Sequence, residues 1–313
     1  MAGNSGNPKN PGWYTGGLAG VMSPGAGNVF YVNGGSDGPV VDTNDGLTPG
    51  TPKQTIASAL ALCTANNNDY VIILNYGANG RAVEAAWPIV VSVDQVHIIG
   101  VGTVGQKWPV VRPAAPAGAD VDAAAFSVTA DRVEIANLEI GGGDTPAGIE
   151  AGDGNVWGLT IHDCFFGVTG ASTGQDGISV PAGMAAPYLT VYGCRFGHFL
   201  TQDGIRLVGN ATRCMLGVPG QPFNAFHHLP GIAINLTAAV TEPGIFGNRI
   251  AVPANTAGAG ITLSATVLDG WVFDNVVNFG DTTMGNNPLA DGAAAGANDW
   301  GNNMVGIVLT MPS

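Results

Sequence analysis

The chain has 313 residues, of which 49 are glycine and 20 are proline; 45% are hydrophobic and only 11% are charged. Its net charge of −13, with only 10 lysines and arginines, excludes a protein that binds nucleic acid through clustered cations. The apolar content excludes a disordered polymer, and the low charge indicates that other copies or other proteins cover much of the surface.

The N-terminus and the cysteines exclude further classes of protein. No basic segment is followed by an apolar one, so we expect no signal peptide, and no apolar run reaches the roughly 20 residues that cross a bilayer. Without a secretory signal, we expect free buried thiols at Cys63, Cys164, Cys194 and Cys214. We therefore expect a protein made in the cytoplasm of its host, without membrane contact, cofactor or metal.

Residues 1–28 are rich in glycine, asparagine and proline and are predicted to form an extended N-terminal arm. The arm contains one group of apolar residues that we expect to contact a partner, namely Trp13, Tyr14, Leu18, Val21 and Met22. Residues 29–313 are predicted to form a single domain.

A short helix is predicted over about residues 52–65. Thr51, Pro52 and Gln54 have the form of a capping box with proline at the first helical position. The apolar residues that follow fall on one helical face, namely Ile56, Ala59, Leu60 and Cys63. We expect this helix to cover one end of the domain, because an open end would expose an apolar interior and an unpaired strand edge.

From residue 71 onward, short segments alternate apolar and polar residues with period two, and glycine, asparagine or aspartate separates them. The isoleucine of a Gly-Ile pair recurs at Ile149, Ile178, Ile205, Ile232, Ile261 and Ile307. A second series of paired strands has its bends at Asn137, Asp163, Gly193, Asn248 and Asn275. Each repeat is predicted to form one coil of a parallel β-helix, whose coils stack about 4.8 Å apart. A β-sandwich would instead show two-residue hairpin turns, which are scarce here.

A family resemblance lies in three segments, FYVNGG (30–35), DTNDGLTPGTPKQTIASAL (42–60) and VHIIGVG (96–102). They resemble the opening of right-handed parallel β-helix proteins of the pectin-lyase-like superfold. The resemblance implies an all-β fold, a right-handed parallel β-helix with a short N-terminal capping helix. It implies no single activity, because this superfold includes lyases, hydrolases, phage tailspikes and non-enzymatic structural proteins.

Two copies of Gln-Asp-Gly-Ile contain a candidate catalytic pair, Asp176 and Asp203. On adjacent coils the carboxylates would stack on the order of 5 Å apart, as in a retaining glycosidase, and His198 could join them. The first copy resembles the Asn-Thr-Asp-Gly-Ile segment of polygalacturonase-like β-helices. The other motifs of that family, and the acidic cluster and arginine base of a pectate lyase, are absent. We therefore interpret Asp-Gly-Ile as a turn that enters a strand, and we expect no catalytic residue.

The remaining candidates also have structural interpretations. Adjacent residues on a strand point to opposite faces, so His227 and His228 are not expected to share a metal ion. Cys164 and Cys194 are predicted to stack inside the domain, one coil apart. A core or subunit-contact role, with a sugar-binding stripe as the alternative, is expected for Phe165, Phe166, Phe196, Phe199, Phe223 and Phe226.

The C-terminal residues 304–313 form a strand-like run with no predicted capping helix after it. Either a long loop over 281–303 or a neighbouring subunit must then cover the last coil. We expect a non-enzymatic virion structural protein of a tailed phage, a homotrimer that decorates or cements a capsid or forms a head or tail appendage. Its arm would contact another virion protein, such as a major capsid protein. The alternatives are a polysaccharide-cleaving tailspike-type glycosidase or lyase that uses Asp176 and Asp203, and a glycan-binding adhesin.

Overall fold

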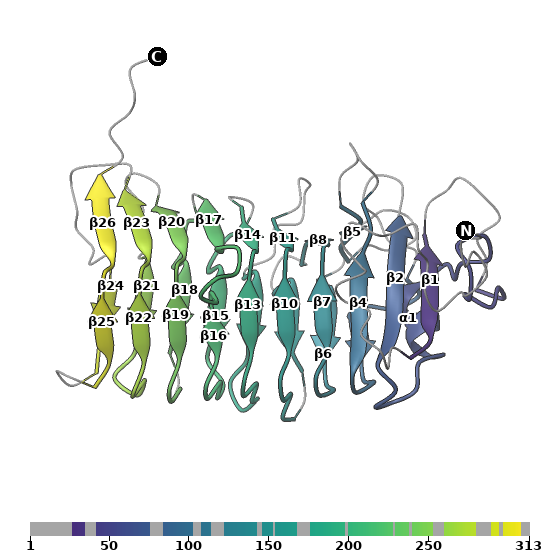
Figure 1. Ribbon diagram of the computed structural model, residues 1–313, viewed down its shortest axis with the longest axis horizontal. Coiled ribbons are helices and arrows are strands. Elements are labelled where there is room, and N and C mark those ends of the chain that lie inside the picture. Colours follow the sequence, from purple (N-terminus) through teal and green to yellow (C-terminus); the bar gives the residue numbers. More distant parts are fainter. Residues whose placement is uncertain are drawn as a thin grey trace, which may run out of the picture.

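The computed structural model describes residues 27–34, 42–75, 84–102, 108–113, 122–142, 146–152, 154–167, 176–197, 200–227, 229–237, 240–252, 260–279, 289–293 and 297–307. Within these ranges the strands are short, and they form three sheets that run along the molecule from β1 to β26 (Figure 1). Neighbouring strands in each sheet are parallel, for example β10 with β13. The predicted all-β fold, a parallel β-helix, is confirmed.

Each sheet contains strands from successive coils of the chain. Sheet A consists of β1 (Val29–Asn33), β2 (Asp69–Asn75), β4 (Val96–Gly100), β7 (Glu134–Ala136), β10 (Thr160–His162), β13 (Thr190–Tyr192), β16 (Met215–Leu216), β19 (Gly244–Phe246), β22 (Trp271–Phe273) and β25 (Asp299–Gly301). Sheet B consists of β3 (Ile89–Val91), β6 (Phe126–Val128), β9 (Ile149–Ala151), β12 (Ile178–Val180), β15 (Ile205–Leu207), β18 (Ile234–Leu236), β21 (Ile261–Leu263) and β24 (Leu289–Asp291). Sheet C consists of β5 (Val110–Val111), β8 (Glu139–Ile140), β11 (Phe165–Phe166), β14 (Arg195–Phe196), β17 (Ala225–His227), β20 (Arg249–Val252), β23 (Val276–Phe279) and β26 (Met304–Ile307).

The Gly-Ile repeat marks the entry to sheet B on most coils. Parallel pairing aligns the isoleucines at positions 149, 178, 205, 234 and 261 in one buried row. Two predicted members do not belong to this row. Ile232 precedes its strand by two residues, and Ile307 pairs with Phe279 in sheet C. The row is continuous because the strand spacing places each isoleucine on the one below it.

The interior is filled by such rows of identical or similar side chains. The rings of Phe166, Phe196 and Phe226 stack with centroids 4.9 and 4.5 Å apart, which is close to the spacing between strands. Cys164 and Cys194 are fully buried free thiols on successive coils, as predicted. The three stacked phenylalanines therefore belong to the core, whereas Phe223 is exposed beneath the Arg249 guanidinium.

An asparagine ladder lies at the bend between sheets A and C. Each side-chain amide donates to the oxygen of the next, from Asn224 to Asn248 (3.0 Å), to Asn275 (2.9 Å) and to Asn303 (2.9 Å). The predicted bends at Asn137, Asp163 and Gly193 are confirmed, but the alignment was wrong by one residue at Asn248 and Asn275, which point inward in line with Cys194. The bend itself is made by Gly247 and other residues with left-handed φ angles, namely Asn137, Asp163, Gly193, Asp274 and Asn302.

A short helix, α1 (Ile56–Leu60), packs against β1, β2 and β3 and buries Ile56, Ala59 and Leu60. It is shorter than the predicted 52–65, and its N-cap is Thr55 instead of Thr51. Lys53 cannot be helical, because its backbone pairs with Val32 as an added parallel bridge.

The last coil differs from the prediction of a covering loop over 281–303. Residues 289–291 and 299–301 are strands β24 and β25, and each has one neighbour in its sheet among the described strands.

Residues 1–26, with the predicted partner contacts at Trp13, Tyr14, Leu18, Val21 and Met22, lie outside the described residues. None of the described helices is long and apolar enough to cross a membrane.

Candidate functional site

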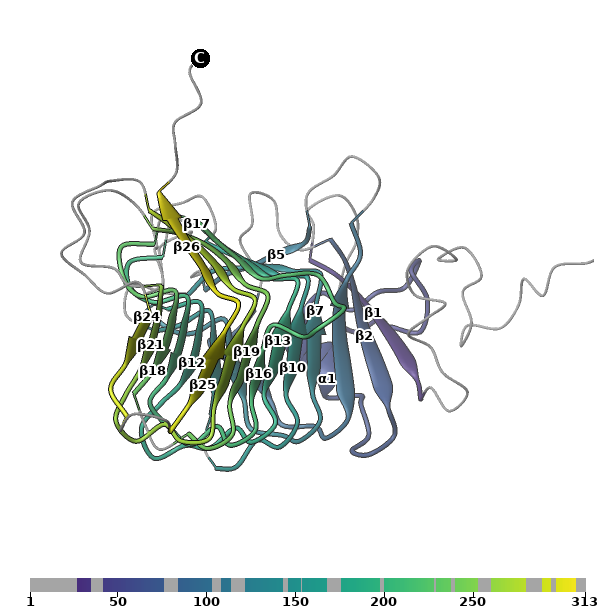
Figure 2. The ribbon, with the colours of Figure 1, turned by 60° about the vertical axis from the view of Figure 1, so that its left-hand side comes forward.

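Sheet B has one row of polar side chains on its outer face, at the middle position of successive strands. The register aligns Ser127, Glu150, Ser179, Arg206, Asn235 and Thr262. Their neighbours in each strand point into the core, because side chains alternate along a strand. In Figure 2 the strands β12, β18, β21 and β24 of this sheet lie side by side at one edge of the prism. We call this set the polar row.

The two predicted aspartates lie on adjacent coils beside the polar row, since Ile178 pairs directly with Ile205. Asp176 Oδ1 accepts a hydrogen bond from the Asp203 amide at 2.9 Å, and Asp203 Oδ1 accepts one from the Ile232 amide at 2.7 Å. Each carboxylate thus supports the turn of the following coil. This is the structural role that the Asp-Gly-Ile turn predicts.

The second carboxylate oxygens of the pair have different surroundings. Asp203 Oδ2 accepts a hydrogen bond from Asn235 Nδ2 at 2.7 Å, so both oxygens of Asp203 have protein donors. Asp176 Oδ2 instead lies 3.8 Å from Arg206 Nη1, beyond hydrogen-bond distance. Arg206 also reaches Gln202 Oε1 at 3.3 Å, and its side chain is 38% exposed. Among the described residues, Asp176 is therefore the buried member of the pair whose second oxygen has no hydrogen-bond donor.

Burial and neighbouring charges shift the pKa of the Asp176 carboxyl group. Burial raises the pKa of Asp176 from 3.8 to about 6; the Asp203 amide opposes the shift, and the Asp203 carboxylate adds to it. Arg206 lowers this pKa and Glu150 raises it further. Burial also raises the pKa of Glu150. Asp176 and Glu150 are therefore two carboxyl groups that keep their protons to a higher pH than usual.

Two buried polar atoms of the polar row have no partner among the described residues, Arg206 Nε and Asn235 Oδ1. One is a donor and the other an acceptor, and the two residues are paired in register. His198, the third predicted member of the site, lies outside the described residues.

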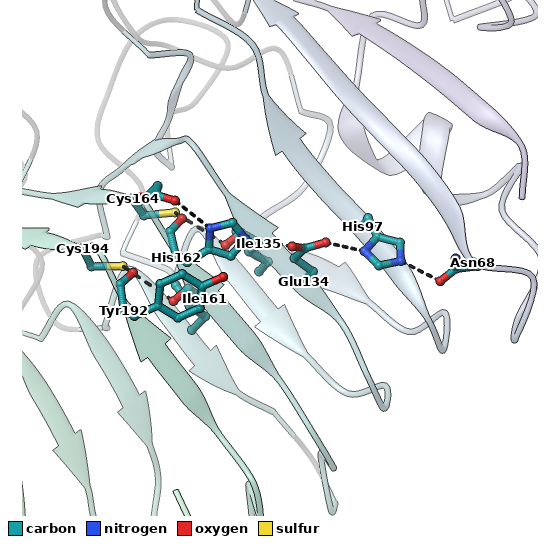
Figure 3. Close-up of polar contacts among 10 residues, drawn as sticks. Asn68, His97, Glu134, Ile135, Ile161, His162, Cys164, Tyr192 and Cys194 are labelled. Atoms are coloured by element: carbon teal, nitrogen blue, oxygen red, sulfur yellow. Dashed lines mark hydrogen bonds and ion pairs between the residues drawn. The ribbon is translucent and has the colours of Figure 1, made fainter. Parts of the chain in front are cut away.

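A second polar cluster lies on the outer face of sheet A, and the sequence analysis missed it (Figure 3). Glu134 accepts hydrogen bonds from both neighbouring coils, from His97 Nδ1 on one side and from His162 Nε2 at 2.7 Å on the other. His97 Nε2 lies 2.7 Å from Asn68 Oδ1, and His162 Nδ1 lies 2.8 Å from Asp163 Oδ2. We call this line of five residues the histidine–glutamate chain.

The histidine–glutamate chain is strongly charged. Burial opposes ionisation of Glu134, but hydrogen bonds from His162 and His97 outweigh it and lower its pKa from 4.5 to about 2. Burial likewise lowers the pKa of His162, but Asp163 and Glu134 outweigh it and raise the pKa from 6.5 to about 9. The two imidazoles also stack on Tyr70 and Tyr192, with centroids 4.3 and 4.8 Å apart.

Chemically, the histidine–glutamate chain is a coil-to-coil connection and not a reaction centre. Both imidazole rings use both nitrogens within the chain, which leaves neither free to bind an ion or take a proton from a substrate. Across the described part of the molecule, no group of three or more His, Cys, Asp or Glu side chains could hold a metal ion. His227 is exposed on β17, and its neighbour His228 lies outside the described residues.

No protein-family model matches the sequence, and no curated protein matches it. Solved structures with a similar fold include a lacto-N-biosidase from Eubacterium ramulus, with 12% identity and a TM-score of 0.41 over 90% of this chain and 68% of that one. A rhamnogalacturonan lyase has 13% identity and a TM-score of 0.42 over 88% and 87% of the two chains. A pectate lyase has 12% identity and a TM-score of 0.36 over 89% and 80%. At this similarity the comparison concerns the fold alone.

Proposed function

We propose that the protein cleaves a polysaccharide bound along the polar row of sheet B. The observation that supports this function is the position of the buried Asp176 carboxyl group, whose Oδ2 lies 3.8 Å from Arg206 Nη1; burial raises its pKa to about 6, and the charge of Glu150 raises it further. Asp176 in its protonated form would donate a proton to the oxygen of the glycosidic bond as it breaks. Glu150 would take a proton from a water molecule, whose oxygen forms the new bond to the anomeric carbon as the glycosidic bond breaks, and Arg206 would hold a substrate oxygen.

Two atoms of the polar row favour a substrate that carries hydroxyl groups. A hydroxyl group can donate to Asn235 Oδ1 and accept from Arg206 Nε, the two buried atoms that lack partners among the described residues. Asp203 has no catalytic part in this proposal, because backbone and side-chain donors occupy both of its oxygens. The role predicted for the Asp176 and Asp203 pair is thus assigned to Asp176 with Glu150.

The test is release of reducing ends from a panel of neutral and acidic polysaccharides. Asp176→Asn and Glu150→Gln are each expected to lower the rate by at least about 100-fold, the typical contribution of an acid or base. Asn278→Ala, on the outer face of β23 in sheet C and off the polar row, is the control and is expected to keep the wild-type rate. The rate is also expected to fall as pH rises through about 6, where Asp176 loses its proton.

Three outcomes of that panel are distinct. Full activity of Asp176→Asn would remove Asp176 as the proton donor. Binding of a glycan without cleavage would favour the glycan-binding adhesin. Substitution of surface aromatic residues should then abolish the binding. A wild-type protein that is folded yet neither binds nor cleaves any member of the panel would contradict the polysaccharide function altogether.

As a second candidate, we propose a trimeric structural protein of a tailed-phage virion whose arm contacts another virion protein. An exposed aromatic surface on sheet A favours contact with another virion protein, because catalysis on sheet B does not require such a surface. Brief chymotrypsin digestion is expected to cut at Trp13 or Tyr14 and leave the β-helix intact, with sedimentation giving a trimer. A stable monomer with a resistant arm would contradict this candidate.

A further inference from the structure

The outer face of sheet A is apolar over its C-terminal strands. Tyr192, Met215, Phe246, Trp271 and Phe273 lie at outward positions of β13, β16, β19 and β22. Their inward neighbours, such as Ile245 and Val272, are completely buried, so the outer residues have no access to the core. Figure 2 shows β13, β16 and β19 side by side along one flank of the prism, and β22, labelled in Figure 1, follows β19 in the sheet. We call these five residues the aromatic face.

Glycines in the neighbouring strands make the aromatic face flat. A Cβ on Gly301 would lie 2.3 Å from Phe273 Cε1, and one on Gly244 would lie 2.5 Å from Phe246 Cε2 and 2.7 Å from Met215 Sδ. The two rings and the thioether therefore lie against backbone. Trp271 nevertheless remains 45% exposed, and Leu268, three residues before it, is 43% exposed. A flat surface with exposed tryptophan and leucine is typical of a protein contact.

Acidic residues border the aromatic face at its C-terminal end. Asp269 lies at the bend before β22, Asp274 lies at the bend after it, and Asp299 pairs in register with Trp271. All three are exposed. Glu242 lies at the preceding bend, where Arg213 Nε contacts it at 2.5 Å and so offsets its charge. The three exposed aspartates form an acidic rim.

We propose that the aromatic face binds a protein segment that is apolar at its centre and basic at its edges. Apolar side chains of the segment would cover Trp271, while its lysines or arginines would meet the acidic rim. A second copy of this chain fits less well, because it would bring the same acidic rim and a net charge of −13 to the contact. This surface is independent of the carboxylates on sheet B and applies to either candidate function.

The probe is a pair of synthetic strand-length peptides of equal positive charge, one alternating leucine with lysine and the other serine with lysine. Binding is measured by fluorescence anisotropy. The leucine–lysine peptide is expected to bind the wild-type protein at least about tenfold more tightly than the serine–lysine peptide. Trp271→Ser and Asp299→Lys are each expected to weaken its binding by at least about tenfold.

Trp157→Ser is the matched control, because Trp157 is also a half-exposed tryptophan (46%, against 45% for Trp271) but lies at the bend before β10, beside Tyr188, and β10 is separated from β22 by three strands of sheet A. It is expected to leave binding unchanged, and circular dichroism should show that all variants are folded. Equal binding of the two peptides, or wild-type binding by Trp271→Ser, would overturn the proposal. Sedimentation that shows Trp271→Ser dissociating an oligomer would assign the aromatic face to a second copy and overturn it as well.

Discussion

At the scale of single residues, Asp176 and Asp203 come from the same Gln-Asp-Gly-Ile repeat but differ in their surroundings. Both use one oxygen to hold the next turn. The difference lies in the other oxygen: Asn235 donates to it in Asp203, whereas in Asp176 the Arg206 Nη1 atom lies 3.8 Å away and no described residue donates a hydrogen bond to it. A repeated residue in a solenoid can therefore be structural on one coil and chemically available on the next.

His162 is expected to make stability depend on pH. Its pKa is raised from 6.5 to about 9 by Asp163 and Glu134 against the effect of burial, with His97 and Tyr192 as its other ionisable neighbours. Because the folded state binds this proton more tightly, its stabilising effect is complete below pH 6.5 and is lost as pH rises through about 9. The free energy of unfolding of the wild type relative to His162→Gln should fall by about 3 kcal/mol over that window.

Denaturant unfolding of both proteins between pH 6 and pH 10 measures this difference. A histidine NMR titration locates the pKa directly. If the difference in free energy of unfolding between the wild type and His162→Gln stays constant across the window, or if His162 titrates near pH 6.5, the histidine–glutamate chain does not hold the proton.

At the scale of elements, buried ladders align the coils. The asparagine ladder satisfies side-chain amides and backbone carbonyls at a bend where regular strand pairing is interrupted. Asn248 Nδ2, for example, donates to Leu216 O at 2.9 Å as well as to Asn275. The bends next to the ladder need left-handed φ angles, which glycine, asparagine and aspartate adopt at least cost. Ladder and bend together set where sheet A ends and sheet C begins.

Asn248→Ala is expected to destabilise the protein by about 3–5 kcal/mol, because it leaves buried amide and carbonyl groups of the ladder without partners. Asn278→Ala, at a partly exposed position on the outer face of β23, is the matched control and should change stability by about 0.5 kcal/mol or less. Denaturant unfolding of the three proteins checks both values. Equal effects of the two substitutions would mean that the ladder adds no stability.

At the scale of the whole molecule, the fold is nearly one-dimensional. Each coil contacts the coil before it and the coil after it, and the strands of the last described coil, β24, β25 and β26, each have one neighbour in their sheets. Stability should therefore be greatest in the middle of the stack and least at its C-terminal end. The aromatic face and the acidic rim lie near that end, so a partner bound there would also stabilise the weakest coils.

Hydrogen exchange followed by mass spectrometry tests this gradient. Peptides covering β10, β13 and β16 are expected to exchange slowest, and those covering β24, β25 and β26 fastest. Uniform protection along the stack would mean that the coils unfold together, in contrast to the nearest-neighbour expectation.

The sequence by itself determined the fold class, four members of the buried row of isoleucines, the stacked cysteines and the turn role of the two aspartates. Period-two alternation and bend residues are local signals, and a regular strand spacing repeats them without further information. The sequence also predicted a helix after residue 50 but placed its start incorrectly. A long-range bridge between Lys53 and Val32 outweighs the local capping signal.

Only the tertiary structure decided which polar residues meet. His97, Glu134 and His162 are far apart in the chain, and the lengths of the segments between them decide that they lie on one row. The same holds for Glu150 and Arg206 beside Asp176, and for Trp271 beside Asp299. The physical reason is that stacking order depends on the cumulative register of all coils, which no local pattern encodes.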